Sequence, residues 1–376
     1  MNMEVQSRHL DLLHLARQER LLPLTVLTAV LFFAYGDRLS TLLVHPMGLG
    51  LLFFWLFFVI LGSALSVARH AEQLAEGLGE PYGTLILTLT ITTIEVVAIS
   101  AVMFHGENNP TLVRDTLFAV VMIILNGMVG LSLLLGAWRR PEQRYNLQGA
   151  NAYLGLIVPL ATLSLILPEF TTDASAQGLS LTHQRVLILT SAGLYGTFLL
   201  LQTGRHRLYF KQRGAADETP SQATTEGSLT LHTALLFAYM IPIVYLVEHF
   251  AKPIDFVIET LRAPTALGGL VMAVLVATPE AISAVRAALA DQLQRSINIF
   301  LGSVLSTIGL TVPAMLAISH FSGHGIVLGL GRTETIMLVL TLALSMITFA
   351  SGRTNLMQGA VHLVLFGTYL ILIVEG

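Results

Sequence analysis

The sequence predicts an all-α membrane protein of about eleven transmembrane helices, and three observations support this fold class. Of the 376 residues, 54% are hydrophobic and only 11% are charged, whereas a soluble domain carries about a quarter charged residues. The mean hydropathy is +0.73. Apolar runs long enough to cross a hydrocarbon core of about 30 Å recur along the chain. Such a chain could not cover its surface with polar groups in water, so its natural solvent is lipid.

The predicted helices divide into a group of six and a group of five. The first helix follows Arg8, Arg17 and Arg20 and lacks a convincing cleavage site, so we expect it to be retained rather than removed as a signal peptide. The longest hydrophilic stretch, Arg205–Leu229, is rich in Gly, Pro, Ser and Thr and is typical of a flexible linker. The predicted spans are 21–36, 45–68, 81–104, 115–137, 151–169, 183–203, 230–248, 265–285, 297–319, 332–350 and 357–374.

Lysine and arginine indicate the orientation of these spans. If the N-terminus is inside, the inner segments hold 14 of the basic residues and the outer segments hold 6. Cytoplasmic loops carry the excess of Lys and Arg in membrane proteins. We therefore expect a cytoplasmic N-terminus, a cytoplasmic linker and a C-terminus outside.

The two halves of the chain echo one another. At an offset of 185 residues, Glu95 in the third span falls on Glu280 in the eighth, and Thr93 falls on Thr278. Without the first helix, two sets of five helices remain, and an odd number forces the second set to insert upside down. Inverted repeats of this kind are common in secondary transporters. The predicted organisation is a leading segment over 1–40, a first repeat over 41–204, a linker over 205–229 and a second repeat over 230–376.

Glu95 and Glu280 are the main candidates for a functional site. An ionised carboxylate at the bilayer centre costs roughly 2.5–3.5 kcal/mol, and neither acid has a Lys or Arg three or four residues away on its helix. A protonated acid with a structural hydrogen bond could explain one such residue. Two acids at equivalent positions of inverted repeats favour a shared site near the membrane midplane.

Oxygen donors accompany both acids. Because proline cannot donate the intrahelical hydrogen bond, we expect the helix to break or bend at Pro279 and to free nearby carbonyls. Carboxylate, carbonyl and hydroxyl oxygens are the ligands of hard cations such as Ca²⁺, which takes about six to eight of them. The candidate ligands besides the acids are the hydroxyls of Thr92, Thr93, Ser303 and Ser306, the carbonyls of Ala277 and Thr278, and the amide of Asn126.

A buried carboxyl site suits the exchange of a cation for protons. Desolvation disfavours the ionised form, so an empty site is expected to take up protons. The cation and the protons then compete for the same oxygens, which is the physical basis of antiport.

The same residues carry a resemblance to a known family. The segments "GEPYGTLILTLTITTIE", "ATPEAISAVRAALADQLQRSINIFLGSVLSTIGLTVP" and "SGRTNLMQGAVHLVLFGTYL" resemble the calcium/cation antiporter superfamily, and within it the bacterial calcium/proton branch of the ChaA type. The Gly-Asn pair that the wider branch carries before each acid is replaced by "TTIE" and "ATPE". The resemblance implies one leading helix, two five-helix repeats, and a signature acid in each repeat at Glu95 and Glu280.

The function that the residues and the resemblance predict is exchange of Ca²⁺ for H⁺ by alternating access, in a bacterial inner membrane. Na⁺/H⁺ or K⁺/H⁺ exchange on the same fold is the alternative, and a passive cation channel or a membrane-embedded enzyme is less favoured. We expect no cofactor other than the transported ions and no nucleic-acid partner, since the net charge is −3. The absence of cysteine excludes thiolate metal sites and Fe–S clusters. Assembly into a homo-oligomer stays open.

Three further polar positions receive structural rather than functional interpretations. Arg114 and Asp115 are expected to form a solvated interfacial ion pair, and Glu80 to favour a helix N-terminus through the helix dipole. His362, inside the last span, is expected to be a hydrogen-bonded packing residue rather than a pH sensor.

Overall fold

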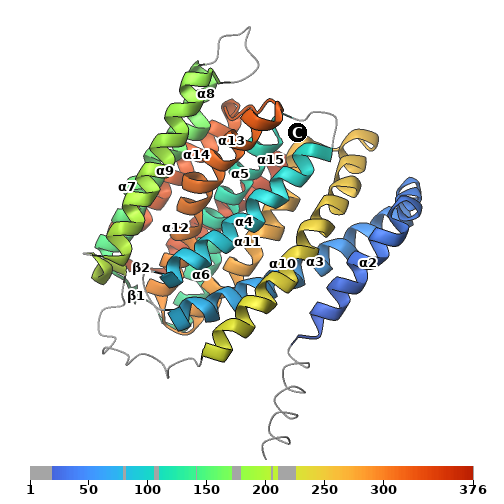
Figure 1. The fold of residues 1–376 in the computed structure, drawn as a ribbon. Helices are drawn as coiled ribbons and strands as arrows, with labels where there is room; N and C mark the ends of the chain where they lie inside the picture. The colour runs from blue at the N-terminus through green and yellow to red at the C-terminus, as the bar shows by residue number, and fades with distance from the viewer. Residues whose placement is uncertain are drawn as a thin grey trace, which may run out of the picture.

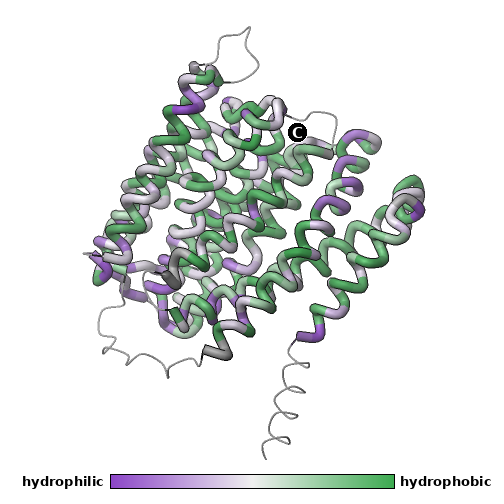
Figure 2. The backbone as a smooth tube through the Cα atoms, viewed as in Figure 1, coloured by the Kyte–Doolittle hydropathy of each residue, from purple (hydrophilic) through white to green (hydrophobic). Residues whose placement is uncertain are grey.

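The computed structural model is a bundle of long helices that run roughly alongside one another (Figure 1). It describes residues 19–78, 82–105, 110–140, 142–171, 179–204, 206–210 and 226–375. The predicted linker falls mostly outside the described residues, as do the first eighteen positions and Glu80. Hydrophobic residues cover most of the length of the outer helices, as expected for a surface that faces lipid (Figure 2).

The first half of the described chain ends within the predicted linker, because residues 207–210 form a short helix there. The order and bounds of its helices are α2 (Leu21–Ser40), η1 (Thr41–Val44), α3 (Pro46–Leu78), α4 (Tyr82–His105), α5 (Leu112–Met122), η2 (Ile123–Met128), α6 (Val129–Arg139), α7 (Leu147–Ala161), η3 (Thr162–Ile166), α8 (Leu167–Thr171), α9 (Leu181–Thr203) and η4 (Arg207–Phe210). Segments η2 and η3 are π-helical turns within longer helices, and such widened turns are frequent at functional sites.

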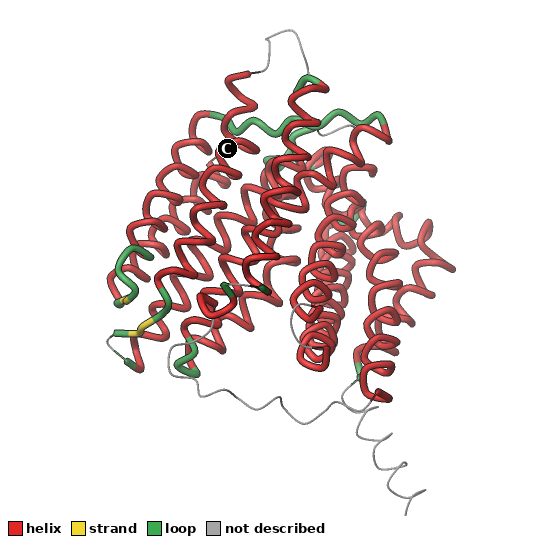
Figure 3. The backbone as a smooth tube through the Cα atoms, turned by 60° about the vertical axis from the view of Figure 1, so that its left-hand side comes forward, coloured by secondary structure: helices red, strands yellow, loops and turns green. Residues whose placement is uncertain are grey.

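The second half repeats this pattern of long helices with widened turns. Its elements are α10 (Glu226–Asp255), η5 (Phe256–Thr260), α11 (Thr265–Leu289), α12 (Leu293–Ser306), η6 (Thr307–Thr311), α13 (Val312–Ser322), α14 (Arg332–Thr348) and α15 (Leu356–Glu375). Segments η5 and η6 are again π-helical. In the described chain the only strands are two-residue segments, β1 (Gln143–Arg144) and β2 (Arg353–Thr354), which pair antiparallel between two turns (Figure 3).

The predicted all-α membrane fold is confirmed, and each predicted span contains a helix. Nine helices of the described chain are long and apolar enough to cross a membrane. A tenth arises if the helices from Leu21 to Val44, which meet at an angle of 86°, form one span. Helix α14 occupies the predicted tenth position, but its 17 residues give a length of only about 25 Å. The count of eleven therefore stays a prediction.

Helix α3 departs clearly from its predicted boundary. The predicted span stops at residue 68 because charged residues follow, whereas the helix continues to Leu78. Its last turns bury His70, Ala71 and Leu74 and keep Glu76 exposed, so the chain there forms an amphipathic helical extension rather than a loop.

Glu19 connects the start of α2 to α3 and α10 through side-chain hydrogen bonds. Its carboxylate accepts hydrogen bonds from Arg69 at 2.5 Å and from the Tyr239 hydroxyl at 2.9 Å. His70 lies 3.4 Å from the same carboxylate and 3.0 Å from the His232 ring nitrogen. This polar cluster joins three helices. Its hydrogen bonds pair the buried charge of Glu19, which would be costly if it were left unpaired.

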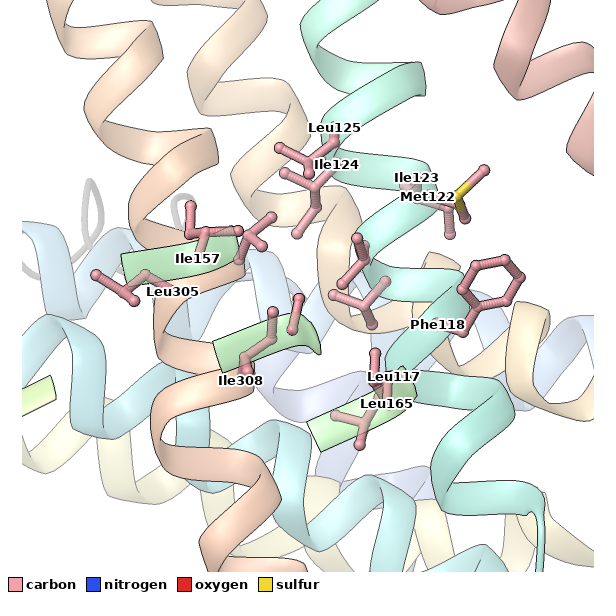
Figure 4. Packing of buried hydrophobic residues seen from close by; sticks show 14 of the residues in the cluster. Leu117, Phe118, Met122, Ile123, Ile124, Leu125, Ile157, Leu165, Leu305 and Ile308 are labelled. Carbon is pink, nitrogen blue, oxygen red and sulfur yellow. The ribbon is translucent and has the colours of Figure 1, made fainter. Parts of the chain in front are cut away.

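Two hydrophobic cores hold the bundle together. One is built mainly by α2, α3 and α10, with parts of α4 and α11, and α10 packs along α3. The other joins α5 to α9 with α11 to α15. Figure 4 shows its centre, where Leu117 and Ile124 face Ile157, Leu165 and Ile308 from neighbouring helices.

Helix α11 approaches α5 closely because it has glycine at the contact. A Cβ atom at Gly269 would lie 2.8 Å from the backbone of Asp115 and of Thr116. Small residues permit such close approach between membrane helices. The contact fixes the outer half of α11, the helix that carries Glu280.

Candidate functional site

Glu95 on α4 and Glu280 on α11 are both buried in the interior of the bundle. Their residues are 2% and 9% exposed. Both carboxylates contact one continuous helical rod formed by α12, η6 and α13, against which α4 and α11 pack. Glu95 and Glu280 thus contact the same rod at different positions along it, and a site shared by the two acids stays a prediction.

Glu280 is held by a serine hydroxyl on this rod. The Ser303 hydroxyl donates a hydrogen bond to Oε2 of Glu280. The Ser306 hydroxyl donates to the Ser303 carbonyl at 2.9 Å. Both serines were predicted as ligands, and the structure places both beside the second acid.

Glu95 is held further along the rod by two threonines that the sequence analysis did not select. The hydroxyls of Thr307 and Thr311 donate to Oε2 of Glu95 at 3.2 Å and 2.8 Å. The sequence does contain a signal for them, because Ser303, Thr307 and Thr311 follow one another at intervals of four residues. Residues spaced by four lie on one face of a helix.

Two buried oxygen atoms at this site have no hydrogen-bond partner in the described part of the chain. They are Oε1 of Glu95 and the hydroxyl of Thr92, which lies one turn earlier on α4. Buried polar groups normally find a partner, and an orphaned one calls for a physical reason. A cation bound between these oxygens would satisfy both.

A cavity of about 340 Å³ reaches Glu280 from the end of the bundle where α9 ends and α10 begins. Ser303 and Ser306 line its deep end. Glu95 is not among its lining residues, so this cavity reaches only one of the two acids. The other polar side chains along it are Glu72, Thr88, Gln202, Ser283, Arg295 and Asn298.

The prediction that the helix breaks at Pro279 is wrong, and the alternative, a bend at this position, stays a prediction. Helix α11 runs without interruption from Thr265 to Leu289, since neighbouring helices can support a proline within a membrane helix. The missing N–H leaves the carbonyl four residues earlier, that of Leu275, without its donor. The carbonyls of Ala277 and Thr278, predicted as ligands, therefore stay within the helical hydrogen-bond ladder.

The hydroxyl of Thr93, which was predicted as a ligand, and that of Thr278, which was predicted only through its carbonyl, are both engaged by their own helices. Thr93 is exposed on the outer face of α4, and its hydroxyl donates to the Leu89 carbonyl at 2.6 Å. The Thr278 hydroxyl donates to the Val274 carbonyl at 2.5 Å. Of the two predicted threonines on α4, only Thr92 is buried on the side of Glu95.

Asn126 belongs to a different polar network. Its amide nitrogen donates to the Thr341 hydroxyl at 2.8 Å, and its oxygen lies 3.3 Å from His362 Nδ1. The other ring nitrogen of His362 lies 3.0 Å from the Thr348 hydroxyl. The structure therefore places Asn126 against α14 and α15 rather than beside the acids, and gives His362 the packing contacts predicted for it.

Arg114 and Asp115 form the predicted ion pair, but Asp115 is only 9% exposed, so the expectation of a solvated pair is wrong for this residue. Arg114 contacts Asp115 at 2.8 Å and also donates to the Gly329 carbonyl at 3.0 Å. Asp115 lines a second cavity, of about 270 Å³, together with Thr333 and Glu334. This cavity lies at the end of the bundle opposite the first, where α11 and α14 begin and α15 ends. Among the described residues, no group of three His, Cys, Asp or Glu side chains could hold a metal ion.

The family described as "Sodium/calcium exchanger protein" matches residues 48–204 and 231–374 of this chain. The chain belongs to this family. The resemblance noted in the sequence is thereby confirmed, and the chain is a membrane-embedded transporter of the cation/proton antiporter type.

Two curated relatives span nearly the same length. The chain is 42% identical over 315 residues to the "Putative ionic transporter y4hA" of Sinorhizobium fredii, covering 84% of this chain and 86% of that one. It is 38% identical over 374 residues to the "Sodium-potassium/proton antiporter ChaA" of Escherichia coli, covering 98% of each. It is also 24% identical over 260 residues to the "Ca(2+)/H(+) antiporter ChaA" of Bacillus subtilis, covering 66% of this chain and 73% of that one.

Solved structures support the same fold. The structure of native YfkE matches with a TM-score of 0.73 at 20% identity, covering 94% of this chain and 97% of the other. The H⁺/Ca²⁺ exchanger CAX matches with a TM-score of 0.67 at 13% identity, covering 93% of this chain and 86% of the other.

Proposed function

We propose that this sodium/calcium exchanger family member exchanges Ca²⁺ for H⁺ at a site shared by Glu95 and Glu280. The observation that carries the proposal is the convergence of both buried carboxylates on one helical rod. Together they can hold two protons or neutralise one divalent cation. Either loading leaves no net charge in a low-dielectric interior, where an unpaired charge is expensive.

Exchange of Na⁺ or K⁺ for H⁺ is the second candidate. It is favoured by the 38% identity to a relative named as a sodium-potassium/proton antiporter, compared with 24% for the relative named as a calcium/proton antiporter. The site also offers few protein oxygens for Ca²⁺, which takes about six to eight oxygen ligands.

Flux measurements on purified protein in vesicles test both candidates. With a pH-sensitive dye inside the vesicles, addition of Ca²⁺ outside is expected to drive protons out of the vesicles, and Na⁺ and K⁺ form the comparison arms. A response to Na⁺ or K⁺ alone would transfer the function to the second candidate. Cation entry without proton movement would indicate a passive channel and contradict antiport.

The proposed domain organisation remains a leading segment over 1–40, repeats over 41–204 and 230–376, and a linker over 205–229. Two observations support it. The two stretches matched by the family, 48–204 and 231–374, leave out the first helix and the linker. In addition, the π-helical turns η2 and η6 lie in the helix that follows each acid-bearing helix.

The cavity that reaches Glu280 is proposed to open to the cytoplasm of a bacterial inner membrane. The helix ends around it carry Arg69, Arg286 and Arg295, part of the 14-to-6 excess of basic residues at that end. Alternating access would then bring the ions to Glu95 and Glu280 from the second cavity, beside Asp115, in the opposite state.

Cysteine labelling tests this orientation, because the chain contains no cysteine of its own. Ser283 lines the first cavity and Thr333 lines the second. A membrane-impermeant maleimide is expected to label the Ser283→Cys variant only in inverted vesicles and the Thr333→Cys variant only in right-side-out vesicles. Labelling of both variants from one side, or the reverse pattern, would overturn the proposed orientation.

A further inference from the structure

Thr307 and Thr311 donate hydrogen bonds to only one of the two carboxylate oxygens of Glu95. Both hydroxyls donate to the same oxygen atom, Oε2, at 3.2 Å and 2.8 Å. The other oxygen, Oε1, is buried and has no partner in the described chain. Neither threonine is more than 2% exposed, so solvent does not compete for these hydrogen bonds.

The two threonines sit at the ends of the π-helical turn η6. Three hydroxyl groups on this rod therefore donate hydrogen bonds to the two acids. Ser303 donates to Glu280, and Thr307 and Thr311 donate to Glu95. The corresponding widened turn in the first half, η2, contains Asn126, whose amide is engaged by Thr341 and His362. The orientation of both carboxylates thus depends on one helix from the second half.

We propose that Thr307 and Thr311 are positioning residues, which fix Oε2 of Glu95 and leave Oε1 as the single oxygen that this acid gives to a transported cation. The inference rests on the proposed exchange site. The orphaned Thr92 hydroxyl, one turn before Glu95 on α4, is the neighbouring oxygen for the same ion. A side chain that is already fixed in its binding geometry loses less conformational entropy when the ion arrives.

The hydrogen bonds to Oε2 of Glu95 affect which cation the site prefers. Strong Ca²⁺ sites commonly use a carboxylate through both of its oxygens, whereas the threonine pair restricts Glu95 to one. Removing the hydroxyls would free Oε2 but would also release the side chain from its fixed position. We expect the loss of fixed geometry to dominate, since the hydrogen bonds involve a charged group and are shielded from water.

The test compares valine and serine at both threonines. Valine keeps the volume of threonine and removes the hydroxyl, whereas serine keeps the hydroxyl and removes a methyl group. Calorimetry on purified protein with Ca²⁺ as the probe is expected to show at least about a tenfold loss of affinity for Thr307→Val/Thr311→Val, the factor that corresponds to 1.4 kcal/mol. The Thr307→Ser/Thr311→Ser protein should bind within about threefold of the original chain.

A role in packing alone would give the opposite order, because serine leaves a void and valine does not. Thr197→Val serves as the control for loss of a hydroxyl, since Thr197 is exposed on α9 and donates to the Gly193 carbonyl of its own helix. Thermal unfolding in detergent identifies any variant that fails to fold, in which case the single valine variants replace the double one.

The outcomes separate this inference from the proposed function. Unchanged Ca²⁺ affinity in the folded valine variants, with binding lost in Glu280→Gln, would overturn the positioning role and leave the exchange site standing. Absence of Ca²⁺ binding by the original chain, with Na⁺ binding that is insensitive to the valine substitutions, would overturn both. Weaker binding in the valine variants and near-normal binding in the serine variants is the result we expect.

Discussion

The Glu280→Gln variant is expected to fold normally and to lose at least about a hundredfold of its exchange rate. Glutamine has the shape of glutamate but can neither ionise nor carry a proton. Without this carboxylate, one charge of a divalent cation stays unneutralised in the membrane interior, which costs roughly 2.5–3.5 kcal/mol, and each 1.4 kcal/mol is a factor of ten. Glu280 is also the acid that lines the cavity, so we expect every ion that uses this entrance to meet it.

The measurement is cation-driven proton flux in vesicles that contain equal amounts of folded protein. Glu76→Gln is the matched control, because Glu76 is an exposed acid on α3 outside the cavity. Normal exchange by the Glu280→Gln variant would remove Glu280 from the mechanism. A similar loss in the control variant would show that the assay responds to surface charge rather than to the site.

A second large effect is expected from pH. If two protons leave the site when one Ca²⁺ binds, the apparent affinity should fall about a hundredfold for each pH unit of acidification in the range where both carboxyl groups are protonated. If only one proton leaves, the fall should be about tenfold per unit. Na⁺ or K⁺, with a single charge, is expected to follow the one-proton slope. The dependence should disappear in the Glu95→Gln/Glu280→Gln double variant.

The slope is read from binding titrations at a series of pH values. An affinity that does not change with pH would mean that the carboxylates keep their charge throughout, which is incompatible with coupling at this site. A slope that persists in the double variant would assign the protons to other groups.

Much of the fold could be predicted from the sequence because lipid imposes simple rules. A segment that crosses the hydrocarbon core must be long, apolar and helical, so each apolar run predicted a helix that the structure contains. Charges define boundaries less reliably. The polar residues after position 68 predicted a loop, yet α3 continues for ten more residues as an amphipathic helix.

The two acids could also be predicted, because a carboxylate within an apolar run stands out at any helix orientation. The ligands around them were harder to identify. Thr92 and Thr93 are adjacent in sequence but project about 100° apart around the helix. Only the packing of α4 decides that Thr92 is buried and Thr93 exposed. Asn126 lies in the helix that follows α4, but its amide donates a hydrogen bond to Thr341 and contacts neither acid.

Thr307 and Thr311 show the opposite case, because they contact Glu95 although the sequence analysis did not select them. In the sequence they are ordinary hydroxyl residues of a membrane helix, where threonine often satisfies its hydroxyl on its own backbone. Their contact with Glu95 joins residues more than 200 positions apart and depends on how α4 crosses η6. The spacing of four places both threonines on the same helix face as Ser303, but it does not predict which helix crosses that face.

The most direct measurement of the shared site is the number of protons released when a cation binds. Calorimetric titrations of purified protein with Ca²⁺, repeated in buffers of different ionisation enthalpy, give this number from the dependence of the observed heat on the buffer. We expect release of between one and two protons for each Ca²⁺ at neutral pH, and none from the Glu95→Gln/Glu280→Gln double variant. Ca²⁺ binding to the original chain without proton release would contradict the proposal that cations and protons compete for Glu95 and Glu280.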